Sequence, residues 1–307
     1  MKIIEAADKL SQGNRKVCLA IGFFDGVHLG HQQIIRQTID DARQREAVAL
    51  VVTFDRHPNT VVAPHRVPPL IYSLSQKLRA IQALGTDTVL LLHFDKAFSQ
   101  QPGDVFVRKL VGELGPVRSL CVGTNFTFGH KRSGDVALLR KLGGELGFEV
   151  RGMAAVSLDG KVISSTRIRD AIRTGHLHLA GQMLGRPYSL AGPVVPGDGL
   201  GRKLGFPTAN LDVTGLALPP NAVYAAQALL RGKIHRAVVN IGLRPTLQLP
   251  QPRLRVEAHL PGLDRDFYGE ELELILLGKL RDEKKFGSVA ELKEQIRRDV
   301  DQARSLA

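Results

Sequence analysis

Two histidines three residues apart have side chains and spacing that could bind a ligand. They lie in the segment GFFDGVHLGHQ, Gly22 to Gln32, with Gly26 and Gly30 on either side of the first histidine. A strand-like run precedes the segment and a helix-like run follows it, so we expect both imidazoles at a helix N-terminus. Unpaired N–H groups and the positive end of the helix dipole favour anions at that place. The segment therefore predicts that His28 and His31 bind phosphate. A metal pair is the alternative, but the segment offers no third ligand at fitting spacing.

A second candidate anion site is the segment ISSTRIRDAI, Ile163 to Ile172. Hydroxyl side chains, among them Ser165 and Thr166, stand before a predicted helix whose first turn carries Arg167 and Arg169. Hydroxyls there suit helix capping and phosphate binding alike. Two arginines at the positive end of a helix are unfavourable unless an anion compensates them, so the segment predicts triphosphate binding. A plain capped helix is the other reading.

The third candidate is GDGLGRKLGFPTANLD, Gly197 to Asp212. It lacks the third glycine of a dinucleotide fingerprint, and no Walker A sequence exists in the chain, so any ATP must be held by other means. Thr208 and Asn210 offer hydroxyl and amide oxygens, which are hard ligands of the kind that magnesium on a polyphosphate accepts. Further along, Glu257 alternates with apolar Val256 and Ala258 in a predicted strand, and a surface glutamate on an edge strand is the plain interpretation of that pattern.

The first part of the chain supplies the elements that must position the histidines. Short apolar runs alternate with longer amphipathic ones, a βα rhythm typical of a parallel sheet covered by helices on both faces. Ligands of such sheets bind at the carboxyl ends of the strands. Strands are expected near 17–23, 48–54, 88–94, 119–123 and 148–156, and helices near 31–45, 74–84, 102–114 and 135–146.

The rhythm changes near residue 186. From Tyr188 to about Leu277, short strand-like runs are separated by Gly, Pro and Asp, which predicts an antiparallel sheet or a small barrel. An amphipathic helix with Ser288 as N-cap closes the chain. We therefore expect a Rossmann-like α/β domain over residues 1–185 and a small antiparallel β-barrel domain with a C-terminal helix over 186–307. The Pro/Gly-rich stretch 185–199 is predicted to be the junction.

Composition narrows the class of protein. The chain has 307 residues, 43% of them apolar, and no apolar run near the ~18 residues of a membrane span. Cys18 and Cys121 lie in apolar runs without a CxxC partner, so buried free thiols and a cytoplasmic location are expected. The net charge of +12 raises the question of a nucleic-acid partner, but the chain has no basic tail and no RNP-type motif. A solvated basic surface is the preferred interpretation, and no membrane partner is expected.

The histidine segment resembles the HxGH signature of the nucleotidyltransferase superfamily. Two further segments, TFDRHP (53–58) and VGTNFTFGHKRSGD (122–135), resemble the FMN adenylyltransferase module of bacterial FAD synthetases. The chain departs from that pattern at Arg56, where proline is usual, and at Thr124 and Asn125, where an acidic pair is common. The resemblance implies transfer of an adenylyl group from ATP to FMN. It assigns catalytic roles to His28 and His31, and nucleotide or flavin contacts to Asn125, Ser165, Thr166 and Arg169. Asp25, beside the turn, is expected either to help bind the nucleotide with magnesium or to cap the turn.

Motifs after residue 186 resemble riboflavin kinase in their order along the chain. They are GRKLGFPTAN, NIGLRPT (240–246), VEAHL (256–260), DFYG (266–269) and LRDEKKF (280–286). Leu200 and Ala222 depart from the family pattern. The whole chain thus resembles the bacterial bifunctional riboflavin kinase/FMN adenylyltransferase family, with Mg²⁺, ATP and flavins as the implied ligands. In this half the resemblance makes Glu257 the base for the riboflavin hydroxyl, gives nucleotide contacts to Gly201, Thr208, Asn210 and Arg281, and makes Thr208 and Asn210 the magnesium ligands.

Two other functions remain open from the residues alone. One is a nucleotidyltransferase for a different phosphate ester, with a second domain that binds flavin without catalysis. The other is a basic nucleic-acid-binding protein, whose affinity would fall steeply with salt. Oligomeric state is also open, self-association included.

Overall fold

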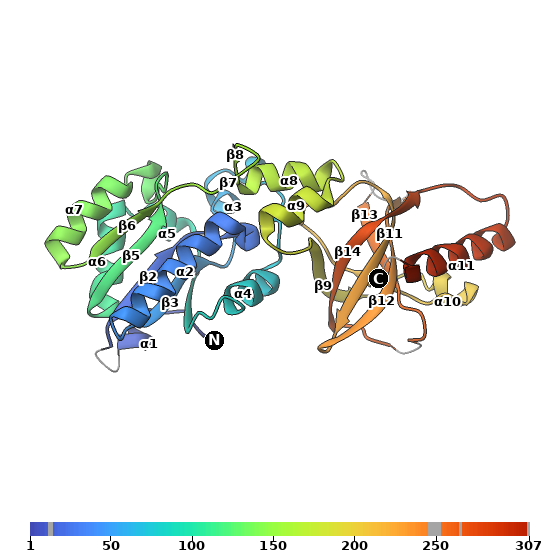
Figure 1. Ribbon diagram of the computed structural model, residues 1–307, viewed down its shortest axis with the longest axis horizontal. Coiled ribbons are helices and arrows are strands. Elements are labelled where there is room, and N and C mark those ends of the chain that lie inside the picture. Colours follow the sequence, from blue (N-terminus) through green and yellow to red (C-terminus); the bar gives the residue numbers. More distant parts are fainter. Residues whose placement is uncertain (12–14, 245–252, 264–265, 306–307) are drawn as a thin grey trace. The chain divides into compact units, whose positions relative to one another are not determined.

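The computed structural model describes residues 1–11, 15–244, 253–263 and 266–305 (Figure 1). Contacts between residues divide the chain into two compact units. The first unit comprises Met1–Pro68 and Leu74–Ser165, and the second comprises Pro69–Ser73 and Thr166–Ala307. No helix in the described ranges is both long and apolar enough to cross a membrane.

A parallel six-stranded sheet organises the first unit, in the order β1-β4-β3-β2-β5-β6 (Figure 1). From β2 the chain adds β3 and then β4 on one side of β2. It then crosses to the other side of β2, where it adds β5 and β6. Ligands of open α/β sheets bind at such a reversal, outside the carboxyl ends of the strands. The strands are β1 (Lys2–Ile4), β2 (Val17–Ile21), β3 (Val48–Phe54), β4 (Thr88–Leu92), β5 (Val117–Gly123) and β6 (Glu149–Met153).

Helices cover both faces of this sheet, as the βα rhythm predicts. Val17, Leu19 and Ile21 of β2 pack in one apolar cluster with residues of α6 and α7, whereas Cys18 and Ala20 pack in another with residues of α2 and α4. The alternation buries both faces of the strand. The helices are α1 (Asp8–Ser11), α2 (Leu29–Gln44), α3 (Asn59–Val62), α4 (Leu74–Gln82), α5 (Lys96–Ser99), α6 (Gly103–Leu114) and α7 (Val136–Leu146), with short 3-10 turns η1 (Asp25–Val27), η2 (Pro64–Arg66) and η3 (His130–Arg132) and a hairpin of β7 (Ser157–Leu158) and β8 (Lys161–Val162).

The second unit is built on a closed barrel of six antiparallel strands, in the order β10-β13-β12-β11-β14-β9. The structure thus settles the sequence alternative of open sheet or barrel in favour of the barrel. The strands are β9 (Ser189–Val195), β10 (Thr208–Leu211), β11 (Ala222–Leu230), β12 (Lys233–Arg244), β13 (Arg253–His259) and β14 (Glu271–Asp282). Strand β9 closes the barrel by pairing with both β10 and β14, so part of the stretch predicted as a junction is a strand.

Four helices belong wholly or mainly to this unit. They are α8 (Ser165–Arg173), α9 (Leu177–Leu184), α10 (Leu200–Leu204) and α11 (Val289–Ser305). Helix α11 packs Val300 and Ala303 against the barrel residues Val223, Ala225 and Val238. Its predicted N-cap is confirmed, because the N–H of Glu291 donates to the Ser288 hydroxyl at 3.2 Å.

Candidate active sites

The turn between β2 and α2 is strained at the place where the histidine segment begins. Phe24, Gly26 and Val27 have φ angles of 53°, 77° and 42°. A positive φ is rare for an aromatic residue and rarer for a β-branched one, so neighbouring groups must hold this conformation. One of them is the side-chain amide of Gln32, which donates to the Val27 carbonyl at 2.9 Å.

The two histidines lie together at the N-terminus of α2, as the sequence predicts. His28 is the N-cap residue, and its Nδ1 accepts from the His31 N–H at 3.4 Å. The imidazole rings are stacked with their centroids 3.6 Å apart. Burial, and then the nearby His28 and Lys77, hold the pKa of His31 well below its usual range. The buried Nδ1 of His31 has no hydrogen-bond partner among the described residues, which leaves it available to a ligand.

The remaining predicted contacts of the adenylyl site divide between the units. Asp25 is buried in η1, and its carbonyl accepts from the Ser165 hydroxyl at 3.2 Å, so these two residues join the histidine turn. Asn125 is exposed just beyond the carboxyl end of β5. Thr166 and Arg169 group with the second unit, where the Arg169 Nε donates to the Pro69 carbonyl at 2.7 Å.

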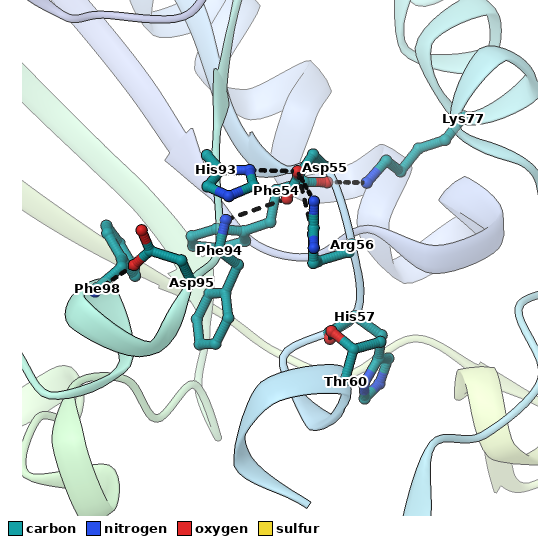
Figure 2. A network of polar contacts seen from close by, with 10 residues as sticks. All are labelled: Phe54, Asp55, Arg56, His57, Thr60, Lys77, His93, Phe94, Asp95 and Phe98. Carbon is teal, nitrogen blue, oxygen red and sulfur yellow. Dashed lines mark hydrogen bonds and ion pairs between the residues drawn. The ribbon is translucent and has the colours of Figure 1, made fainter. Parts of the chain in front are cut away.

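A polar network ties the ends of β3 and β4 together beside the turn (Figure 2). Asp55 accepts from the Phe94 N–H at 3.0 Å, from the Arg56 guanidinium at 3.1 Å, and contacts the His93 Nδ1 at 2.7 Å. These contacts outweigh the effect of burial and lower the pKa of Asp55. The network fixes the start of the segment that follows each strand, including Phe94.

An aromatic cavity opens at the same edge of the sheet. Its volume is about 940 Å³, and Ile21 at the end of β2 and Phe54 at the end of β3 are among its walls. Lys96, Lys131 and Arg132 add positive charge to the lining. Seven of the 12 phenylalanines in the chain line it, so its walls offer aromatic faces and edges of the kind that pack against flat ring systems. They are Phe23, Phe54, Phe94, Phe98, Phe106, Phe126 and Phe128.

In the second unit, Glu257 has an asparagine on each side. It pairs with Asn210 of β10 and with Asn240 of β12, and directly paired residues share one face of a sheet. Val256 and Ala258 are buried, whereas Glu257 is only partly buried, so its carboxylate is on the outer face of the barrel. Arg255 lies 3.7 Å from the Glu257 carboxylate and donates to Asp198 at 3.1 Å.

The glycine-rich segment before β10 packs on the predicted magnesium ligands. A Cβ at Gly197 would lie 2.1 Å from the Asn210 side chain. A Cβ at Gly201 would lie 2.5 Å from the Phe206 carbonyl and 3.0 Å from the Thr208 hydroxyl. Such approaches are closer than atoms tolerate, so a larger residue at position 197 would displace the Asn210 side chain, and position 201, which faces backbone, requires glycine. The packing places Gly201 against Thr208 and Gly197 against Asn210, and the nucleotide and magnesium contacts of these residues stay predictions.

Arg281 is placed differently from the other predicted contacts. Its guanidinium makes hydrogen bonds of 2.8 to 3.0 Å to the carboxylate of Asp299, which is 2% exposed. This ion pair joins the end of β14 to α11, and the predicted nucleotide contact of Arg281 stays a prediction. In the motif NIGLRPT, Pro245 and Thr246 lie outside the described residues.

The donor set of the second unit fits a magnesium ion held on a nucleotide. The buried Oδ1 of Asn210 has no hydrogen-bond partner in the described part of the chain, and the Thr208 hydroxyl lies two residues away on the same strand. No cluster of three or more His, Cys, Asp or Glu side chains in the described ranges could hold a metal without other ligands. Magnesium commonly takes one or two protein ligands and completes its shell with phosphates and water, so the residues present fit it.

Sequence reasoning missed three features of these sites. Lys77 is buried beside the histidine turn, although its position on the apolar stripe of a predicted helix was a readable signal. The aromatic cavity depends on segments that are far apart in the chain. Asn240 and Arg255 stand beside Glu257 only through strand pairing, which the sequence pattern did not specify.

Comparisons with known proteins agree with the two-unit architecture. The family model for FAD synthetase matches residues 10–167, and the model for riboflavin kinase matches residues 184–307. A bifunctional riboflavin kinase/FMN adenylyltransferase from Escherichia coli K12 is 38% identical over 97% of this chain and 96% of its own length. The corresponding protein from Haemophilus influenzae is 35% identical over 99% of both chains.

A solved structure has the same fold along its length. The crystal structure described as a macrolide-efflux protein from Streptococcus pneumoniae superposes with a TM-score of 0.83, at 27% identity and 99% coverage of both chains. Both halves therefore have family matches, and the relatives span the chain from end to end. The chain belongs to the bifunctional riboflavin kinase/FMN adenylyltransferase family.

Proposed function

We propose that each unit performs one of the two reactions for which the relatives are named, with ATP as the second substrate of both. The second unit converts riboflavin to FMN, and the first converts FMN to FAD. The observation that carries the proposal is the presence of a separate set of convergent polar groups in each unit, with a buried, unpartnered ligand atom in each: His31 Nδ1 and Asn210 Oδ1.

In the first unit, adenylyl transfer needs no nucleophile from the protein. A phosphate oxygen of FMN attacks the α-phosphorus of ATP, the bond from that phosphorus to the bridging oxygen breaks, and pyrophosphate leaves. His28 and His31 at the N-terminus of α2 stabilise the charge that builds on the phosphate oxygens. Asp25, Asn125 and Ser165 of this unit complete the nucleotide contacts in this proposal, and the contacts expected of Thr166 and Arg169 stay predictions.

The aromatic cavity of the first unit is the proposed site for the flavin ring of FMN. A planar apolar ring can stack on or meet the edges of the phenylalanine side chains. The positive charges of Lys96, Lys131 and Arg132 suit the phosphate at the other end of the molecule. Ring and phosphate recognition together would distinguish FMN from phosphate esters that have no aromatic ring.

In the second unit, phosphorylation requires a base and a nucleotide clamp. Glu257 accepts the proton of the riboflavin 5′-hydroxyl as its oxygen attacks the γ-phosphorus and ADP leaves. Thr208 and Asn210 would hold magnesium, which would supply positive charge beside the ATP phosphates, and Gly201 would let the backbone approach the nucleotide. Arg281 is a further proposed nucleotide contact. The proposed location of the protein is the cytoplasm.

Incubation of the purified chain with riboflavin, ATP and magnesium, followed by chromatography of the flavins, tests this function. FMN should appear first and FAD after it, with ADP and pyrophosphate as the other products. Conversion of supplied FMN without any phosphorylation of riboflavin would favour a second unit that only binds flavin. Salt-sensitive binding of DNA or RNA with no flavin turnover would overturn both assignments.

A further inference from the structure

Lys77 is a buried cation that has no assigned role in either reaction. It occupies the buried face of α4 together with Gln76 and Ile81, and only 4% of it is exposed. Lysine is almost never fully buried unless its charge is compensated, because burial removes the water around the ammonium group. Its presence on an otherwise core-facing stripe therefore requires an explanation.

The ammonium group of Lys77 joins the histidine turn to the end of β3. Its Nζ donates to the Phe54 carbonyl at 2.7 Å, to the Phe23 carbonyl at 3.3 Å and to the Thr53 hydroxyl at 3.4 Å. The Thr53 hydroxyl in turn donates to the same Phe23 carbonyl at 3.1 Å. Figure 2 shows the side chain reaching from its helix toward the strand end that carries Phe54 and Asp55.

Lys77 contacts the backbone at the start of the strained turn. Phe23 immediately precedes Phe24, the first of the residues with positive φ, and the turn continues through Val27 to the N-cap His28. The Lys77 ammonium also lies above the Phe23 ring, 4.5 Å from its centroid. A strained turn keeps its shape only where surrounding contacts hold it. Lys77 supplies two such contacts, both to Phe23 at the start of the turn: the hydrogen bond to its carbonyl and the contact with its ring.

Charges from three other elements face Lys77. Asp25 of η1 and Asp55 beyond β3 act to raise its pKa, and His31 of α2 is close enough for Lys77 to lower the pKa of the imidazole. Burial outweighs the two carboxylates and lowers the pKa of Lys77 to about 8. The ammonium form thus predominates at neutral pH and is lost under mildly alkaline conditions.

We propose that Lys77 is a positioning residue for adenylyl transfer: its ammonium group fixes the Phe23–Val27 turn against β3 and so sets His28 and His31 at the phosphates. The proposal rests on the function proposed above for the first unit. An apolar side chain of similar size, such as methionine, could fill much of the same space but could not donate to the three oxygens. The charge, rather than the volume, is what the position needs.

The test compares Lys77→Met, which keeps most of the length and removes the charge, with Lys77→Arg, which keeps the charge at all pH values used. In full-length protein supplied with FMN and ATP, Lys77→Met should lower kcat for FAD formation by about 10²-fold, because small displacements of catalytic groups cost that much. The KM for FMN should change much less, since a group that acts only in the transition state leaves ground-state binding unchanged. Lys109→Met, at an exposed position of α6, is the control for loss of a lysine.

The pH profile separates this role from a merely structural one. FAD formation by the wild type should fall as pH rises through about 8, where Lys77 loses its proton. In Lys77→Arg the fall should shift upward by at least about one pH unit, because guanidinium stays protonated. A wild-type rate that does not fall, or a fall at the same pH in Lys77→Arg, would overturn the proposal.

The riboflavin kinase activity of the same samples reports on the second unit. Circular dichroism reports on the whole chain, so a loss of signal with kinase activity retained indicates unfolding of the first unit. A folded Lys77→Met variant that makes FAD at the wild-type rate would also refute the role of Lys77. A wild type that makes no FAD at all would instead refute the proposed function of the first unit, so the two failures are distinguishable.

Discussion

At the scale of single residues, the histidine pair is the feature of the first unit that points most specifically to a phosphate ligand. The Nδ1 of His31 is buried without a partner in the described chain, and the His28 ring is stacked against it. A buried nitrogen without a hydrogen bond costs free energy in the absence of ligand, which a phosphate oxygen would recover. The pair is therefore better explained by ligand binding than by capping of α2 alone.

Replacement of either histidine should separate the two activities. We expect His28→Ala or His31→Ala to reduce FAD formation by ~10²–10³-fold, the typical cost of one lost charge-stabilising donor, while FMN still accumulates from riboflavin. Chromatography of the flavins measures both. The exposed His65→Ala variant, in η2 of the same unit, should behave like the wild type. Undiminished FAD synthesis by a folded variant of either histidine would refute its assignment.

Lys77 predicts a pH dependence of stability as well as of activity. Its pKa is about 8 in the folded chain and near 10.4 when exposed, so between these values the unfolded chain binds more protons. Stability then rises with pH across that window, by at most about 1.4 kcal/mol per pH unit, and shows no such change below it. The difference in unfolding free energy between wild type and Lys77→Met should follow this course in denaturant titrations. A difference that stays constant from pH 7 to pH 10 would contradict the assigned pKa.

At the scale of elements, the short glycine-rich segment around α10 packs its backbone closely against residues of the proposed kinase site. A Cβ at Gly201 would lie 2.5 Å from the Phe206 carbonyl, and backbone cannot yield as a flexible side chain can. Gly201→Ala should therefore displace Thr208 and lower riboflavin phosphorylation at least about tenfold, with FAD formation from supplied FMN retained. Gly278→Ala on β14, where a Cβ meets nothing within 4 Å, is the matched control. Equal kinase rates in the two variants would show that the close packing is unimportant.

The sequence predicted the longer elements of the first unit well because each of them has its own periodic pattern, but it did not predict the short elements β1, α1, α3 and α5. Runs such as 48–54 became β3, and the helix expected near 74–84 became α4. In the second unit the pattern was less decisive at Ser189–Val195, where Gly192 and Pro193 interrupt an apolar run. That segment is β9, and Gly192 is needed there because a Cβ would lie 2.0 Å from the Asp212 carbonyl.

Parts of the sites depend on contacts that local patterns do not encode. The histidines, Thr208 and Asn210 could be identified because they lie within short motifs. The burial of Lys77 could be read from the apolar stripe of its predicted helix, but its contacts could not, because Phe23 and Phe54 come from two other segments. Asn240 likewise meets Glu257 only when the register of β12 and β13 is fixed.

At the scale of the whole molecule, the barrel is complete within residues 189–282. Residues 186–307 alone should therefore fold and convert riboflavin to FMN without making FAD. Helices α8 and α9 group with the same unit, so a fragment of residues 166–307 should unfold at a higher denaturant concentration. Denaturant unfolding and flavin chromatography measure the two properties. A folded shorter fragment that leaves riboflavin unphosphorylated would mean that Glu257, Thr208 and Asn210 do not form a self-contained site.

The central claim is that two reactions occur at two independent sites, and Glu257→Gln tests it most directly. This change keeps the side-chain volume but removes the proposed base. The decisive measurement compares the full-length variant and the wild type in two assays, one started with riboflavin and the other with FMN. The account predicts that phosphorylation of riboflavin falls by ~10²-fold or more, while supplied FMN is converted to FAD at the wild-type rate. Equal loss of both activities in a folded variant would contradict it.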